Sequence, residues 1–486
     1  MKNIICFFLI LSSFCERSRA QSVGFEYTNS SSQLQQSELI IENAAHHYLI
    51  AGLVTPFYSS KAYGMKLIEL DASGNLLQEK SFIKPNNALG LLGIFERPNE
   101  YLGIGGMTRA DSDSNFLWIA HFSKTLDLLK DTTIYISQSE QGFGQCTVFR
   151  DTIFLGATVF QWASTDQLLP FSAKISMDGE LIALKKYSGV LDFVNKMYVP
   201  NDTSKFFILH GEELRKVDKS FNLTGETLRF AYPLPYLNAQ GDIKYLSDTT
   251  FLLTGKYWTT DSDDDQDIGV AMCSTNFNVL KIKKFGKGKD TADMPAALKS
   301  IDYTDKNKIF IGGTLDVSIS LPTNANRPSA FVLVQYDSTL QQRWMKTYGN
   351  DAYYFMLGLL ATSDGGCLMY GVKCDYQNNA GADLYVLKVN EQGNVTGTFA
   401  TPFVQTLNIY PNPAHETVWI ELPSKMPTKC ILDIYAANGQ KVFATEVSEE
   451  QKLLQVNVSD WTQGIYFYTL QSSIGGITHS GKIIVR

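Results

Sequence analysis

Short apolar phrases that end in glycine recur along most of the chain. The gaps between these glycines are 53, 51, 55, 44, 57 and 59 residues. This spacing indicates an internal repeat of about 50 residues. In chain order the phrases are "YLIAG" to Gly52, "YLGIG" to Gly105, "IFLG" to Gly156, "FFILHG" to Gly211, "FLLTG" to Gly255, "IFIGG" with Gly312 first of its pair, and "CLMYG" to Gly371.

Each glycine phrase stands in the same alternating context. A short apolar strand precedes it, and a polar loop and an alternating strand follow it, as in 64–74 and 331–341. A turn rich in Asp, Asn, Ser and Gly then leads into a further strand, which is hairpin chemistry. The pattern predicts four antiparallel strands, repeated seven times.

Four-stranded units of this length are typical of β-propeller blades, whose radial closure leaves few exposed strand edges. We therefore predict an all-β chain with a seven-bladed β-propeller over residues 21–400. The phrase "VGFEYT" at 23–28 is expected to close the ring as the outer strand of the last unit, whose own end at "NVTGTF" is weak. Unit four, with the 44-residue gap, fits the pattern least.

Units five to seven also resemble a family of secreted bacterial propeller repeats. The matching phrases are "RWMKTYGN" at 343–350, "DGGCLMYG" at 364–371 and "DLYVLKVNEQGN" at 383–394. The resemblance implies a fold and no particular activity.

The pattern changes after residues 401–406, which we interpret as a linker. Residues 407–486 read as short alternating strands separated by turns. Pro411 and Pro413 prevent a continuous strand at the entry, and "ANG" at 437–439 favours a tight hairpin. A small immunoglobulin-like β-sandwich is the expected fold.

This segment resembles the C-terminal sorting domain of the type IX secretion system of Gram-negative bacteria. The resemblance rests on "YPNPA" at 410–414, "IYAANGQKV" at 434–442, "GIYFY" at 464–468 and "GKIIV" at 481–485. It implies recognition by the outer-membrane translocon and its sorting peptidase, and a passenger that is anchored at the surface or released. The residues that carry the motif are Tyr410, Pro411, Asn412, Pro413, Gly439, Gly464, Tyr466 and Lys482.

The N-terminus has the pattern of a secretory signal. Lys2 precedes an apolar run at 4–14, and "SRA" precedes Gln21. These features predict a signal peptide at 1–20, cleaved between Ala20 and Gln21, and export first to the periplasm. No later apolar run is long enough to cross a membrane as a helix.

Charge and cysteine usage narrow the possible functions. The net charge of -7 argues against nucleic-acid binding, which needs a basic footprint. Five cysteines remain after the signal, an odd number without tight spacing, so buried free thiols are predicted rather than a disulfide framework.

The sequence contains few motifs for catalysis or metal binding. It has no Gly-x-Ser-x-Gly, His-Glu-x-x-His or Cys-x-x-Cys motif. Asp261, Asp263 and Asp265 have the alternating spacing of a calcium loop, but Gln266 and Met272 replace the glycine and glutamate of an EF-hand. A solvated acidic turn is the favoured interpretation, calcium is the alternative, and no other cofactor is expected.

Aromatic residues are predicted on the loop face where propellers bind ligands. The main candidates are Tyr58, Trp162, Trp258 and Tyr376, with Tyr63, Tyr187 and Tyr353 on the same face. Rings beside carboxylates suit sugar stacking, although loop aromatics often pack only locally. We expect a secreted or surface-displayed binding or structural module for a glycan or surface protein. The alternatives are a glycan-active hydrolase or lyase that uses paired carboxylates, and a scaffold within a surface assembly.

Overall fold

The chain is all-β, as predicted. In the described ranges of the computed structural model every regular element is a strand. These ranges contain no helix that could cross a membrane. The structure describes residues 24–29, 34–55, 64–84, 86–109, 111–112, 114–138, 141–161, 167–187, 194–198, 205–210, 213–229, 236–238, 241–259, 265–288, 291–317, 327–375, 382–395, 407–422, 430–448, 451–472 and 477–486.

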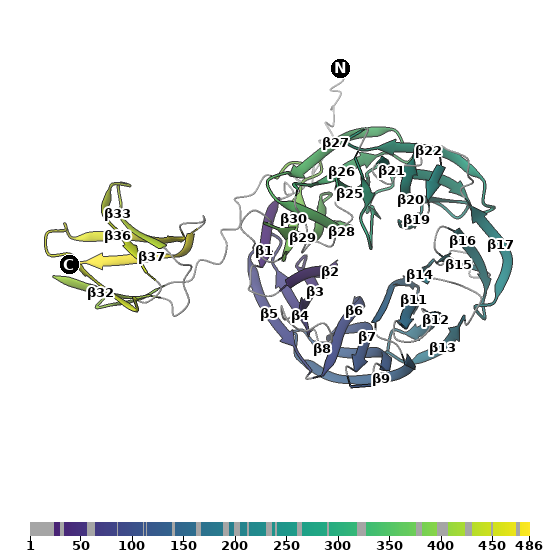
Figure 1. Ribbon diagram of the computed structural model, residues 1–486, viewed down its shortest axis with the longest axis horizontal. Helices are drawn as coiled ribbons and strands as arrows, with labels where there is room; N and C mark the ends of the chain where they lie inside the picture. Colours follow the sequence, from purple (N-terminus) through teal and green to yellow (C-terminus); the bar gives the residue numbers. More distant parts are fainter. Residues whose placement is uncertain are drawn as a thin grey trace, which may run out of the picture.

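Sheets of antiparallel strands form a ring from residues 24–395 (Figure 1). Two sheets have the orders β2-β3-β4-β5 and β6-β7-β8-β9. An eight-stranded sheet follows, in which two antiparallel units join through a parallel contact of Gln145 with Lys196. The strands of this half are β2 (Leu34–Glu42), β3 (Tyr48–Thr55), β4 (Gly64–Leu70), β5 (Leu76–Phe82), β6 (Asn87–Glu96), β7 (Glu100–Arg109), β8 (Ser114–Ser123), β9 (Leu128–Gln138), β10 (Gln141–Phe149), β11 (Thr152–Gln161), β12 (Gln167–Ser176), β13 (Leu181–Lys186), β14 (Val194–Tyr198), β15 (Lys205–His210), β16 (Glu213–Asp218) and β17 (Leu223–Arg229).

The other half of the ring repeats this arrangement with two broken inner strands. β18 and β19 both pair with β20, and β23 and β24 both pair with β25. The strands are β18 (Tyr236–Asn238), β19 (Ile243–Tyr245), β20 (Thr250–Trp258), β21 (Gln266–Ser274), β22 (Val279–Phe285), β23 (Met294–Pro295), β24 (Ile301–Asp302), β25 (Ile309–Leu315), β26 (Ala330–Tyr336), β27 (Gln342–Gly349), β28 (Tyr353–Ala361), β29 (Cys367–Cys374) and β30 (Ala382–Val389).

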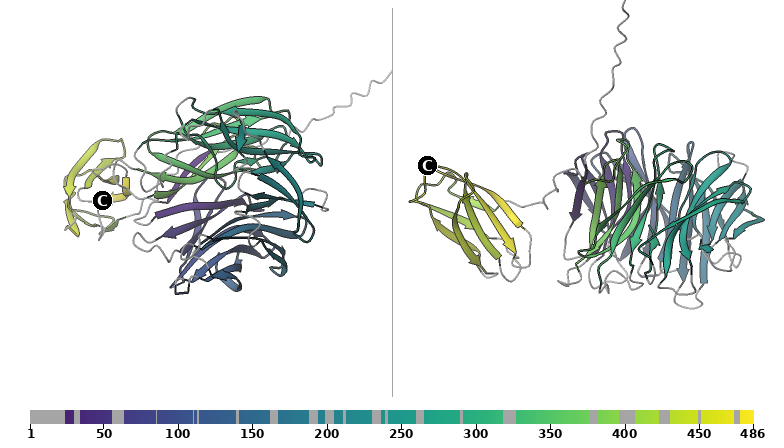
Figure 2. Two further views of the ribbon diagram at one scale, coloured as in Figure 1. Left: turned by 45° about the vertical axis from the view of Figure 1, so that its right-hand side comes forward. Right: turned by 90° about the horizontal axis from the view of Figure 1, so that it is seen from above.

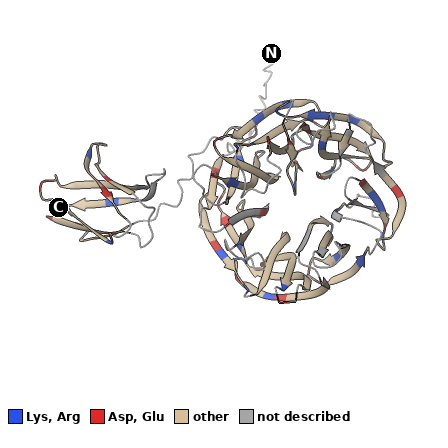
Figure 3. Ribbon diagram, viewed as in Figure 1, with Lys and Arg blue, Asp and Glu red and all other residues tan. Residues whose placement is uncertain are grey.

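The N-terminal strand completes the last sheet of the ring. β1 (Phe25–Asn29) pairs antiparallel with β30, from Phe25 opposite Lys388 to Asn29 opposite Leu384. The sequence prediction for this segment is confirmed. The strands run roughly along the ring axis (Figure 2), and residues of both charge signs occur around the ring (Figure 3).

The turns between third and fourth strands share one construction. The side-chain oxygen of Asp71 accepts the N–H groups of the residues two and four positions later, at 2.8 and 2.9 Å, and Asp337 does the same. The residue three positions after the aspartate has a positive φ, which is 87° at Gly74 and 57° at Leu340. The Leu340 side chain is fully buried, whereas a Cβ on Gly74 would lie 2.4 Å from the Phe25 ring. These turns therefore join sheets as well as strands.

The C-terminal domain consists of two sheets, β31-β32-β35 and β34-β33-β36-β37, in the described residues. Val418 and Ile420 of the first sheet and Leu432, Tyr466 and Ile483 of the second share one buried core. The strands are β31 (Asn408–Tyr410), β32 (Thr417–Glu421), β33 (Cys430–Ala436), β34 (Lys441–Val447), β35 (Leu453–Asn457), β36 (Gly464–Ser472) and β37 (Ile477–Val485).

The cysteines in the described residues are free thiols, as predicted. Cys273, Cys367, Cys374 and Cys430 are buried, whereas Cys146 is only half-buried. Burial raises the pKa of the Cys273 thiol to about 12, so this thiol remains protonated at neutral pH.

Candidate functional site

The inner strands of the ring enclose a cavity of about 890 Å³. Its wall includes residues of β2, β6, β10, β14 and β19, residues 298 and 299 before β24, Ile301 of β24, and Tyr370 of β29. Residues far apart in sequence therefore meet around one space. A large concave site with a few convergent polar groups is the usual form of a ligand pocket.

Irregularities in the inner strands place side chains in the wall of this cavity. The pairing register shifts around Glu38 in β2 and around Leu92 in β6. Asp242 and Lys299 lie in the breaks between β18 and β19 and between β23 and β24. Bulges and breaks re-aim side chains that a regular strand would direct elsewhere. All four residues line the cavity.

The repeated glycines lie opposite these irregularities. A Cβ on Gly105 would lie 2.0 Å from the carbonyl oxygen of Gly90, and a Cβ on Gly371 the same distance from that of Phe355. Glycine therefore allows the bent inner strand to approach the second strand closely. Within the described residues the predicted glycines occupy the second strands β3, β7, β11, β20, β25 and β29, whereas Gly211 lies outside them.

One part of the cavity wall carries an ion pair. Lys196 Nζ lies 2.6 Å from Asp242 Oδ1, and the two side chains are 13% and 2% exposed. The backbone N–H of Ile243 donates to the same oxygen at 2.7 Å. Burial and the neighbouring Asp242 carboxylate raise the pKa of Tyr198 well above its usual value. The Tyr198 hydroxyl is thus neutral at any physiological pH.

A second carboxylate near the cavity binds two lysines. Asp302 pairs with Lys244 and, at 2.7 Å, with Lys299. It also accepts the backbone N–H of Ala361 at 3.1 Å, so it joins three sheets of the ring. Burial alone would raise the pKa of Asp302, but the Lys299 and Lys244 ammonium groups lower it to about 2. Asp302 is therefore ionised at neutral pH and has no proton to donate to a leaving group.

The lowered pKa predicts how Asp302 contributes to stability. Ionised Asp302 favours the folded state above about pH 4, and this contribution is lost as the pH falls toward 2. The shift from 3.8 to about 2 corresponds to about 2.5 kcal/mol. We expect the difference in unfolding free energy between wild type and Asp302→Asn to shrink by about this amount as the pH falls from 6 to 2. Chemical denaturation at each pH measures this difference.

The control is an exposed ion pair on the same ring. Asp178 is 75% exposed in its pair with Arg97, so Asp178→Asn should change stability by less than about 1 kcal/mol. A pH-independent difference between wild type and Asp302→Asn would contradict the assignment.

The rest of the cavity wall is largely apolar. Leu92, Phe95, Phe116 and Val148 come from the early strands of the ring, and Val148 is 42% exposed. An apolar wall facing lysine ammonium groups suits an amphipathic ligand that carries a negative charge.

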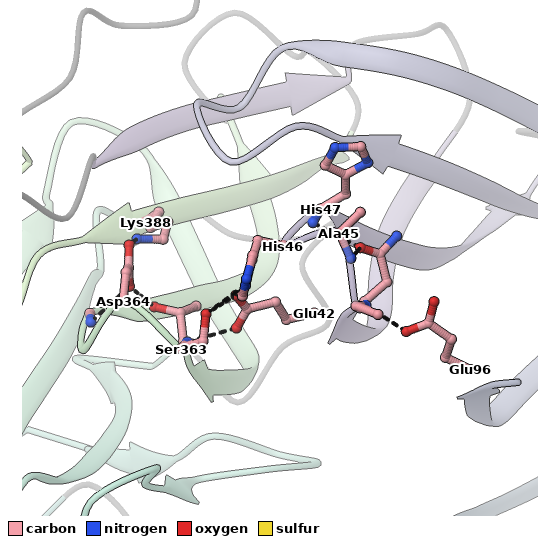
Figure 4. Close-up of polar contacts among 12 residues, drawn as sticks. Glu42, Ala45, His46, His47, Glu96, Ser363, Asp364 and Lys388 are labelled. Atoms are coloured by element: carbon pink, nitrogen blue, oxygen red, sulfur yellow. Dashed lines mark hydrogen bonds and ion pairs between the residues drawn. The ribbon is translucent and has the colours of Figure 1, made fainter. Parts of the chain in front are cut away.

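A serine, a histidine and a glutamate meet outside the cavity, between the first and last sheets (Figure 4). Ser363 Oγ and Glu42 Oε1 lie 2.9 and 3.1 Å from the same atom, His46 Nδ1. Activation of a serine requires the hydroxyl on one ring nitrogen and the carboxylate on the other. Because both contact Nδ1, and the Ser363 N–H donates to Glu42 at 2.7 Å, this contact holds the two sheets together.

Most aromatic candidates from the sequence cannot be placed. Tyr58, Tyr63, Trp162 and Tyr376 lie outside the described residues. Trp258 ends β20, is half-buried and is not among the cavity residues.

The two remaining aromatic candidates are in the core. The prediction that Tyr187 and Tyr353 offer rings to a ligand is wrong, because they are only 4% and 1% exposed. Sequence reasoning placed them on loops, but each packs with strand residues of the sheets.

The acidic turn for which calcium is the alternative interpretation lies largely outside the described residues. Asp261 and Asp263 are in the undescribed part, and only Asp265 is described. No three His, Cys, Asp or Glu side chains converge as metal ligands in the part of the chain that the structure describes.

The lysines and aspartates of the cavity were missed by the sequence analysis. Their signal is a charged residue inside a first strand that is otherwise apolar, such as Asp242 and Lys244 in "DIKYLS". That signal identifies a position in a unit, but not the partner from another unit.

The C-terminal motif residues have structural roles in the second domain. Asn412 donates to the Lys482 carbonyl at 3.0 Å and accepts the Ile484 N–H at 2.8 Å. The backbone of Ala414 continues this pairing, with hydrogen bonds of 2.8 and 2.9 Å to Ile484 and Arg486. The segment between β31 and β32 thus lies along the edge of β37, and Pro411 and Pro413 interrupt the strand as predicted.

Of the other motif residues, Gly439 and Gly464 lie at a turn and at the start of a strand, whereas Tyr466 and Lys482 lie within strands. Gly439 has a φ of 85° in the β33–β34 turn, and Gly464 begins β36. Tyr466 is buried and donates to the Thr462 carbonyl at 2.7 Å, whereas Lys482 is exposed.

Residues 408–486 match the family described as "Secretion system C-terminal sorting domain". They are a type IX secretion C-terminal sorting domain. The sorting domain directs the protein to the cell surface or to secretion from a Gram-negative bacterium, and it implies interaction with the type IX machinery. A comparison with curated proteins found no match.

Solved structures similar to this chain share little sequence with it. The WD40 domain of SCAP from fission yeast is 11% identical, with a TM-score of 0.35, 77% of this chain covered and 99% of that chain. A DUF4221 family member from Bacteroides vulgatus is 9% identical, with a TM-score of 0.33 and coverage of 76% and 99%. KlAtg21 in complex with the coiled-coil of AgAtg16 is 11% identical, with a TM-score of 0.36 and coverage of 62% and 82%.

Proposed function

We propose that residues 24–395 form a seven-bladed β-propeller that is exported as a binding module, with an immunoglobulin-like sorting domain behind it. The sheet orders support this count, since the eight-stranded sheet divides into two units at the β10–β14 contact. The closure of the last sheet by β1 is the arrangement that a propeller requires.

The binding site that we propose is the central cavity. The observation that carries this proposal is its divided wall, apolar at Leu92 and Val148 and cationic at Lys244 and Lys299. Asp302 neutralises only one of the two lysines that it contacts. A ligand with an apolar body and a carboxylate, sulfate or sulfonate group would complete this site.

We include glycans among these amphipathic anionic ligands, because an acidic sugar also joins an apolar face to an anion. The aromatic loop residues Trp162, Tyr58 and Tyr376 would then add to the site, and calcium at Asp261, Asp263 and Asp265 remains the alternative for that loop. A glycan-active enzyme is a weaker proposal. Its general acid would need to be a residue other than Asp302, which two lysines keep ionised.

Binding can be tested with an anilinonaphthalene sulfonate dye, which joins an apolar ring system to an anion. We expect the full chain to bind the dye saturably. Lys299→Gln should weaken binding about tenfold, since a hydrogen bond to a charged group contributes about 1.5 kcal/mol. Leu92→Ser should also weaken it, because the apolar contact is lost.

The control is Leu453→Ser, an exposed residue on β35 of the sorting domain, which should bind like the wild type. Equal dye affinity in all three variants would exclude the cavity as the site. A glycan array probed with the same proteins would show whether an acidic sugar is the ligand, because only a cavity ligand is sensitive to Lys299→Gln.

A further inference from the structure

The sorting domain has apolar side chains on the outward side of its four-stranded sheet. Tyr466, Tyr468 and Leu470 of β36 point into the core. Since successive side chains of a strand point to opposite faces, Ile465 and Phe467 point outward, and they are 46% and 49% exposed. Packing in the core therefore explains the apolar side chains on only one face of β36.

Neighbouring strands extend this apolar strip. Phe467 lies opposite Tyr435 of β33, and Ile465 lies opposite Ile484 of β37. Tyr435 and Ile484 are half-buried. We refer to Tyr435, Ile465, Phe467 and Ile484 as the outer strip. Single exposed apolar residues are common, but a contiguous strip on a soluble domain indicates an interaction site.

Positive charges border the outer strip. Lys482 lies opposite Phe467 in the register of β36 and β37, and Arg486 follows the end of β37. Both are exposed, and neither forms an ion pair with the described residues. Lys441, at the start of β34, is 49% exposed and pairs with Asp433 at 3.0 Å. A matching surface would have an apolar centre and carboxylates at its rim.

We propose that the outer strip is the surface by which the sorting domain docks onto the type IX export machinery, on an apolar receptor site bordered by acidic residues. Export is the role of this domain, and the outer strip combines apolar exposure with two bordering cations, Lys482 and Arg486, that form no ion pair with the described residues. The opposite sheet supplies a useful comparison, because Leu453 on β35 is similarly exposed at 42% without belonging to the strip.

The proposal predicts different effects for two matched variants of the full chain in a bacterium with type IX secretion. Phe467→Ser should lower the amount of protein outside the cell about tenfold, with accumulation in the periplasm, because burial of a phenylalanine is worth about 1.5 kcal/mol or more. Leu453→Ser should be exported like the wild type. Lys482→Glu should also reduce export, whereas Lys482→Arg should preserve it, since charge reversal opposes an acidic rim.

Protease resistance of the purified variants serves as the folding control, because Phe467 and Leu453 are both outside the core. Wild-type export of Phe467→Ser would overturn the proposal, and so would equal losses for Phe467→Ser and Leu453→Ser. Size-exclusion chromatography tests the competing occupant. If the wild type is a dimer and Phe467→Ser is an exported monomer, the strip joins two copies and the proposal fails.

Discussion

Removal of residues 407–486 is expected to leave the rest of the chain folded but retained in the periplasm. The core of the sorting domain consists only of residues from Leu407 onward. The ring is closed by pairing of β1 with β30 and needs no strand from the sorting domain. The two parts therefore have separate cores, and the truncation removes the export signal without opening the ring.

Cell fractionation and protease treatment of intact cells would measure this effect. The truncated chain should be protected inside the cell and resistant to limited proteolysis once released. Fusion of residues 407–486 to an unrelated reporter provides the converse measurement, in which the reporter should appear outside the cell. Export of the truncated chain, or retention of the fused reporter, would contradict the assignment of the signal to this domain.

The repeat could be predicted from the sequence because each unit forms the same local structure, a set of antiparallel strands joined by short turns. Alternation of apolar and polar positions sets the strands, and the short turns set the pairing of neighbours. Even unit four has its four strands, β14 to β17, although Gly211 lies outside the described residues. The ring closure was also predictable, since the last unit lacked an outer strand in sequence.

The cavity could not be predicted in the same way. Its ion pairs join residues of different units, such as Lys196 with Asp242 and Lys244 with Asp302. Local patterns do not encode which side chains of neighbouring units meet. The shift at Leu92 depends on the close approach of two strands, and a single sequence shows only the glycine that permits it.

Two aromatic candidates, Tyr187 and Tyr353, are wrong because their rings are buried in the core. Tyr353 begins β28 and packs into the core between the last sheet and the first. Its ring gains more from that contact than from solvent. In the sorting domain, by contrast, motif residues such as Asn412 act through backbone hydrogen bonds. Sequence resemblance identified these residues, and the structure explains what they do.

Gly105→Ala is expected to destabilise the ring by about 4 kcal/mol. The three atoms nearest to the new Cβ would all belong to the backbone of β6, with the Gly90 carbonyl oxygen at 2.0 Å and the Leu91 Cα at 3.1 Å. No side-chain rotation relieves such a contact, so β6 would have to move away from β7. In chemical denaturation, the denaturant concentration at the unfolding midpoint should be much lower for Gly105→Ala than for the wild type.

The adjacent glycine provides the matched control. A Cβ on Gly106 would meet nothing within 4 Å, and Gly106 has no positive φ. Gly106→Ala should therefore be neutral or stabilise by up to about 1 kcal/mol, because alanine reduces the entropy of the unfolded chain. Similar midpoints for the two variants would mean that the repeat glycine is not required by the bend of the inner strand. A large loss at Gly105 alone would link the repeat directly to the strand that lines the cavity, since Gly90 and Leu91 are both part of its wall.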